Sequence, residues 1–133
     1  MTSSIIYEGR LRSRCLHIQS HRSILNDAPL DNHGKGQSFS PTDLVATALG
    51  SCMLTIMGIK AESLGISLEG TKVEVKKTMG DAPRRIVQID IWLHFLQSWD
   101  SKTRTLLERA AATCPVHHSL HPDIQKNIHF GWP

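Results

Sequence analysis

The longest uncharged stretch of the chain covers residues 44–59, where apolar and small residues follow one another without a charge. Its flanks favour a helix, because Ser40 and Asp43 have the spacing of a capping box and Gly65 suits the left-handed position after a helix. The apolar residues point in every direction, which is typical of a buried helix. The sequence therefore predicts a long core helix over residues 41–64.

This stretch is too short for a membrane span, since a helix needs about 20 apolar residues to cross a bilayer. We therefore expect no membrane association. Covering such a helix on all sides is also difficult for a chain of only 133 residues. A second subunit is expected to cover part of it.

Alternating apolar and polar positions predict strands around this helix. The clearest strand covers residues 84–95, where every second residue from Val87 to Phe95 is apolar. A turn at residues 80–83 joins it to a weaker alternation over residues 72–79. These two strands should form an antiparallel hairpin with one face on the central helix.

The other predicted elements are strands over residues 5–17, with an irregularity at Gly9, over 23–27 and over 124–130, and a helix from Asp100 or Ser101 to about Thr113. Strands precede, separate and follow two helices without regular alternation, which predicts an α+β fold in a single domain over residues 1–133. The polar, Gly-rich segment at residues 30–39 is either a plain connector or a lid over a site, and the sequence leaves both interpretations open.

Composition excludes several classes of function. The formal net charge is +3, and the lysines and arginines are scattered, so nucleic-acid binding is not expected. The N-terminus lacks the apolar stretch of a signal peptide, which predicts a cytoplasmic protein. Cys15, Cys52 and Cys114 form a poor disulfide framework for a secreted domain but suit reduced thiols in the cytosol.

Cys114 lies between a helical pattern and Pro115, where it can cap a new helical turn. A helix N-terminus stabilises a thiolate, and His117 and His118 could add positive charge. The alternative is a cysteine that only ends a helix. Cys114, His117 and His121 also have ligand-like spacing, but Pro122 ends the segment at once, so we expect no metal site.

Two further motifs contain cysteines. The first, SPTDLVATALGSCMLTIMG at residues 40–58, places Cys52 eleven residues after Pro41. The second, ERAAATCPVHHSL at residues 108–120, contains Cys114 before a proline. Together they resemble the OsmC/Ohr family of thiol-dependent hydroperoxide reductases, and most closely its OsmC-like branch. The resemblance implies an α+β intertwined homodimer in which antiparallel sheets wrap long central helices and both subunits contribute to each site.

The resemblance also implies roles for individual residues. Cys52 would attack the peroxide oxygen and Cys114 would close a disulfide with it. The family arginine that stabilises the thiolate and the departing oxyanion matches Arg10 best, with Arg12 as the alternative. Family members have a glutamate directly after the proline to hold that arginine, but Thr42 stands there in this chain.

Asp43 follows Thr42, and helical geometry places it on the opposite side of the helix from Cys52. Asp43 is therefore expected to act as a cap and not to hold the arginine. Cys15 has no counterpart in the family and is expected to be passive.

The leading hypothesis is a cytoplasmic, homodimeric two-Cys peroxidase that reduces organic hydroperoxides with electrons from a dithiol, for example a lipoyl-type reductant. It requires no metal and no organic cofactor. The missing glutamate keeps two alternatives open. One is a protein on the same fold that binds a small hydrophobic ligand without turnover, and the other is a thiol-based redox sensor.

Overall fold

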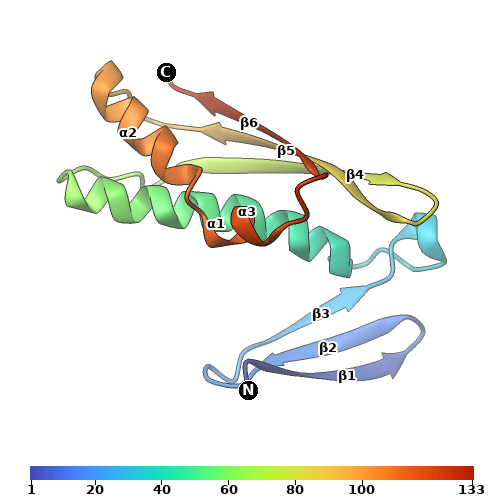
Figure 1. Cartoon of the computed structure of the whole chain (residues 1–133). Helices are drawn as coiled ribbons and strands as arrows, with labels where there is room; N and C mark the ends of the chain where they lie inside the picture. Colours follow the sequence, from blue (N-terminus) through green and yellow to red (C-terminus); the bar gives the residue numbers. More distant parts are fainter. The chain divides into compact units, whose positions relative to one another are not determined.

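The structure, a computed structural model, describes all residues from Met1 to Pro133. It contains two compact units, Met1–Val45 and Ala46–Pro133 (Figure 1). The first unit contains the strands β1 (Ser3–Gly9), β2 (Arg12–His17) and β3 (Ser23–Asp27), which form an antiparallel sheet in the order β1-β2-β3. A short 3₁₀ helix, η1 (Leu30–Asn32), follows them.

The single strand predicted over residues 5–17 is wrong, because the chain reverses in its middle. Gly9, Arg10 and Leu11 all have left-handed backbones, with φ of 84°, 54° and 62°. Left-handed residues at the turn match the twist of the flanking strands, so β2 folds back on β1 as a tight hairpin. The strand predicted over residues 23–27 is confirmed as β3.

The sheet of the first unit has no apolar core of its own. The buried residues of this unit are polar, namely Asn26, Asp27 and Ser40. Successive residues of β1 point to opposite faces, yet Ile5, Ile6 and Tyr7 are each about two thirds exposed. Both faces of this sheet therefore present apolar side chains to the surroundings of the chain.

The second unit contains most of the long helix and a second sheet. Its elements are α1 (Pro41–Ser63, which begins at the end of the first unit), β4 (Lys72–Gly80), β5 (Arg85–His94), α2 (Ser101–Ala111), α3 (Pro115–Ser119) and β6 (Gln125–Gly131). The predicted antiparallel hairpin is confirmed as β4 and β5. β6 instead pairs parallel to β5, which departs from the expected antiparallel sheets. The connection through α2 and α3 is long enough to return the chain to the same end of β5.

The core lies between the helices and one face of the β4–β5–β6 sheet (Figure 1). Helix α1 buries a stripe of residues at helical spacing, namely Ala46, Leu49, Met53, Met57 and Ala61. Strand β5 buries apolar residues at every second position, namely Ile89, Ile91 and Leu93. A Cβ at Gly50 would lie 2.9 Å from Val75 Cγ2 and 3.2 Å from Val73 Cγ1. Gly50 therefore allows α1 to approach β4 closely.

By length and composition, α1 is the one helix that could cross a membrane, with a mean hydropathy of 1.6 over its best 18-residue window. The sequence-based estimate of the apolar length was shorter, because it counted only the uncharged residues 44–59. Core helices of water-soluble proteins have the same length and hydropathy. The burial of the α1 stripe against β5 is the behaviour of such a core helix.

Candidate active site

Cys52 lies in the middle of α1, next to the fully buried Met53 and two residues after Gly50. Because Gly50 brings the helix close to β4, this part of α1 is fixed tightly against the sheet. Cys52 itself is half-buried and packs at the edge of the core. Cys52 is therefore held in place by the helix, while the residue as a whole stays partly exposed.

Cys114 occupies the capping position that the sequence predicts. α2 ends at Ala111, Pro115 takes the first position of α3, and the Cys114 Sγ accepts a hydrogen bond from the backbone N–H of His117 at 3.3 Å. The side chain is completely buried in the core. Proline favours this arrangement because the first helical position needs no N–H.

The fold brings the two cysteines together. Cys52 is one of the groups that raise the pKa of the Cys114 thiol, so the two side chains lie close enough to interact, and neither is part of a disulfide. The two residues come from different helices, so only the packing of α1 against the α2–α3 connection can place them side by side.

The environment of Cys114 holds it as a thiol. Burial raises the pKa of Cys114 and the neighbouring Cys52 raises it further, whereas the backbone N–H groups of His117 and Val116 lower it. The net direction is upward, so of the two interpretations the raised pKa favours a cysteine that ends a helix over a helix-end thiolate. Loss of water destabilises the charged thiolate more than the N–H groups of the short helix stabilise it.

His117 does not supply the positive charge that it could have added. Burial lowers the pKa of His117, and the charges of Lys126 and His118 lower it further. The His117 imidazole is therefore neutral at neutral pH. No group of three or more His, Cys, Asp or Glu side chains is arranged to hold a metal ion.

Arg10 and Arg12 belong to the first unit, whereas Cys52 and Cys114 belong to the second. Arg10 lies in the β1–β2 turn and is exposed. Arg12 Nε and Nη2 donate to the two carboxylate oxygens of Asp27 at 2.6 and 2.8 Å, and these bonds hold the pKa of the Asp27 carboxyl below its usual value. Sequence reasoning missed Asp27.

The start of α1 forms the predicted capping box. Asp43 Oδ2 accepts from the Ser40 N–H at 2.9 Å, and Ser40 Oγ accepts from the Asp43 N–H at 3.0 Å. The expected role of Asp43 as a cap is thus confirmed.

Cys15 lies on β2 in the first unit, where its Sγ accepts a hydrogen bond from Asn26 Nδ2 at 3.1 Å.

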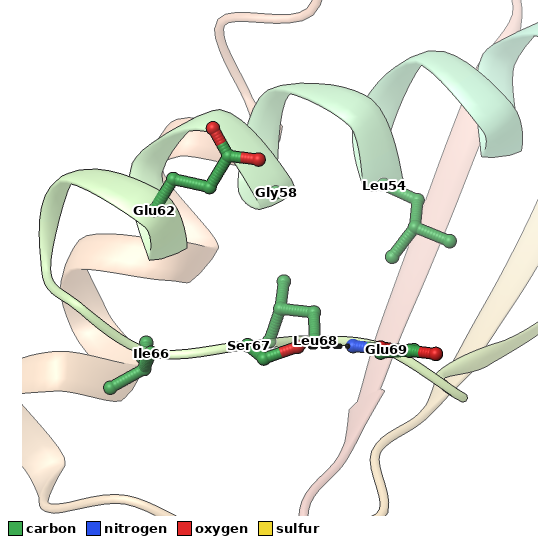
Figure 2. Close-up of a pocket in the computed structure, with 7 residues that line it drawn as sticks. All are labelled: Leu54, Gly58, Glu62, Ile66, Ser67, Leu68 and Glu69. Atoms are coloured by element: carbon green, nitrogen blue, oxygen red, sulfur yellow. Dashed lines mark hydrogen bonds between the residues drawn. The ribbon is translucent and has the colours of Figure 1, made fainter.

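A groove of about 290 Å³ lies between α1 and residues 66–69 of the second unit, and no cysteine lines it. Figure 2 shows Leu54 and Leu68 pointing into this space from the helix and from the following segment. Glu62 and Glu69 add two carboxylates to its walls. The groove is therefore separate from the thiol pair.

The chain is similar to known proteins over most of its length. The family model described as OsmC-like protein matches residues 34–129. A solved structure from Psychrobacter arcticus 273-4 is 48% identical, covers 98% of this chain and 95% of its own, and superimposes with a TM-score of 0.95. That protein is described as having an inferred role in the osmotic stress and detoxification response. No curated protein sequence matches the chain.

More distant solved structures share the fold. The organic hydroperoxide resistance protein OsmC from Legionella pneumophila is 16% identical, with a TM-score of 0.75 over 98% of this chain and 97% of its own. The organic hydroperoxide resistance protein OhrB of Bacillus subtilis is 14% identical, with a TM-score of 0.72 over 98% of both chains. At these identities the likeness establishes the mixed α+β fold with its two sheets.

Proposed function

Because this chain belongs to the OsmC-like protein family, we propose that it is a thiol-dependent peroxidase that reduces organic hydroperoxides to alcohols. The observation that carries this proposal is that two free thiols, Cys52 and Cys114, lie close enough to interact. In a two-thiol peroxidase the attacking and resolving cysteines must meet, and two cysteines on different helices seldom do so by chance.

The proposed reaction begins with the Cys52 thiolate. It attacks the peroxide oxygen, the O–O bond breaks, Cys52 becomes a sulfenic acid, and the alkoxide takes a proton to leave as an alcohol. Arg10 is proposed to stabilise the departing oxyanion. The Cys114 thiol then attacks the sulfenic sulfur, its proton leaves with the hydroxyl as water, and a Cys52–Cys114 disulfide forms. An external dithiol, for example a lipoyl-type one, reduces this disulfide and is itself oxidised.

The assignment of roles is supported by the difference in burial between the two thiols. Cys52 is partly exposed, so a hydroperoxide can reach it, whereas Cys114 is fully buried behind it. The raised pKa of Cys114 keeps its proton available for the water that leaves in the second step. Reduced thiols of this kind persist in the cytoplasm, which is the compartment we propose.

We also propose that the protein works as a homodimer. The apolar side chains on both faces of β1, including Ile5 and Ile6, lack a core in the first unit. The side of α1 opposite its buried stripe is uncharged from Ala48 to Ile59 and exposed. A second copy of the chain would cover both surfaces, since a stable soluble protein seldom leaves so much apolar area in water.

Consumption of cumene hydroperoxide in the presence of dithiothreitol or dihydrolipoamide tests the peroxidase directly. We expect rapid consumption by the wild-type protein and by Cys15→Ser, which removes a thiol in the other unit. Cys52→Ser should reduce the rate to that of the free dithiol. A wild-type rate equal to the dithiol background would refute the proposal.

A further inference from the structure

The first unit contains a charged cavity, and Arg10 is the one residue of its lining to which the proposed thiol chemistry gives a role. It has a volume of about 320 Å³ and lies beside the β1–β2 turn, lined by Glu8, Gly9, Arg10, Arg12 and Lys35. Three of its five lining residues are cations, contributed by a strand, a turn and the loop after β3. Such convergence of cations from separate segments is the usual basis for holding an anion.

A buried carboxylate organises this cavity. Asp27 is only 3% exposed, and both of its oxygens accept from Arg12. The same carboxylate accepts from the backbone N–H of Gln37 at 3.2 Å, and Gln37 Oε1 accepts from Arg12 Nη2 at 2.9 Å. Asp27 therefore fixes Arg12 and the loop that carries Lys35 in one network.

The loop itself is built to present Lys35. A Cβ on Gly34 would lie 1.7 Å from the carbonyl oxygen of Ala28, and Gly36 has a left-handed backbone with φ of 60°. The N–H groups of Gly34 and Gly36 donate to Pro29 and Ala28. Within the segment predicted to be a connector or a lid, residues 34–36 thus form a tight turn that holds Lys35 at the cavity.

The β1–β2 turn presents Arg10 in a similarly constrained way. Arg10 and Leu11 are non-glycine residues with left-handed backbones, which L-residues adopt at a cost. The turn is held by two hydrogen bonds, from the Ala28 N–H to the Leu11 carbonyl and from the Leu11 N–H to Tyr7 Oη. Strain that is maintained in this way is commonly found where a side chain has a function.

The charges of the cavity do not cancel. Asp27 neutralises Arg12, and Arg14 neutralises Glu8 through a 2.6 Å ion pair, whereas Arg10 and Lys35 have no ion pair of their own. Two positive charges are left uncompensated. We propose that this cavity binds a phosphate-type dianion, with Arg10 and Lys35 supplying the charge and Arg12 a fixed set of N–H donors.

Calorimetric titration of inorganic phosphate at pH 7.5 and low salt tests this site, using the full-length Cys52→Ser protein. We expect saturable binding that Arg10→Ala and Lys35→Ala each weaken by about tenfold, the usual effect of losing one charge-assisted hydrogen bond. The matched control is Arg22→Ala, which removes an exposed arginine of the same unit outside the cavity. Glu8→Gln should tighten binding, because it removes the carboxylate from the cavity and frees Arg14.

No saturable binding, an equal loss in Arg22→Ala, or no gain in Glu8→Gln would overturn the proposal. Phenyl phosphate distinguishes the source of the ligand: tighter binding than inorganic phosphate indicates a phosphorylated organic molecule, and equal binding indicates the free ion. Since Cys52→Ser lacks the proposed nucleophile, the result is independent of peroxidase activity. A failed phosphate titration and a failed peroxidase assay therefore refute different proposals.

Discussion

At the scale of single residues, the protonation of Cys114 distinguishes its role from that of Cys52. Its N-cap position alone favours a thiolate, but complete burial and the adjacent Cys52 raise the pKa of its thiol. Burial determines the direction of the pKa shift, because α3 has only five residues. The N-terminus of so short a helix stabilises a buried thiolate only weakly. A sequence can indicate the cap, whereas the depth of burial depends on the whole core.

We predict that Cys114 ionises above the ordinary thiol value of about 8.5. Thiolate absorbance can be followed against pH in Cys15→Ser/Cys52→Ser, where Cys114 is the remaining cysteine. The pKa of Cys114 should be lower in this double variant than in Cys15→Ser, because Cys52 no longer contributes to raising it. Burial should still keep the pKa above the ordinary thiol value. Ionisation of Cys114 below the ordinary thiol value would contradict this account.

The ion pair between Arg12 and Asp27 illustrates what the sequence could not provide. The two residues are cross-strand partners in β2 and β3, so the pair depends on the register of that hairpin. With one strand predicted over residues 5–17, the pairing of β2 with β3 could not be foreseen. Asp27 was thereby overlooked, although a carboxylate at the end of a short strand was visible in the sequence.

At the scale of elements, long periodic segments were predicted well. α1, β4, β5 and α2 all begin within one residue of their predicted starts, because caps and alternation mark them locally. The β1–β2 turn was missed because Arg10 and Leu11 carry no turn signature. Two hydrogen bonds maintain it, in which the Leu11 N–H donates to Tyr7 Oη and the Ala28 N–H donates to the Leu11 carbonyl. The parallel pairing of β6 was also missed, since nothing in its own residues specifies a partner strand.

The packing of α1 on β4 gives a test with a matched control. Gly50→Ala should destabilise the protein by about 1 to 3 kcal/mol, because its Cβ would overlap Val75, a branched side chain that cannot swing away. A Cβ at Gly58 has nothing within 4 Å, so Gly58→Ala should be neutral or stabilising by up to about 1 kcal/mol. Urea denaturation at fixed protein concentration measures both, and equal effects would show that the close approach at Gly50 is unimportant.

At the scale of the whole molecule, the exposed apolar side chains of β1 and the uncharged, exposed side of α1 predict an obligate homodimer. Analytical ultracentrifugation at low micromolar concentration should give about twice the chain mass of 14.8 kDa. Ile6→Glu, which places a charge on an apolar strand that is 64% exposed in the single chain, should shift this mass toward the monomer. A stable, folded wild-type monomer would contradict the dimer and the shared site.

The most direct test of the central claim is the identity of the disulfide that forms during turnover. The reduced protein is titrated with a limiting amount of cumene hydroperoxide, and its peptides are mapped by mass spectrometry. We predict one main bond, between Cys52 and Cys114, with Cys15 free, and in Cys114→Ser a Cys52 sulfenic acid that stalls or over-oxidises. A main bond to Cys15, or faster oxidation of Cys114 in Cys52→Ser than of Cys52 in Cys114→Ser, would contradict the account.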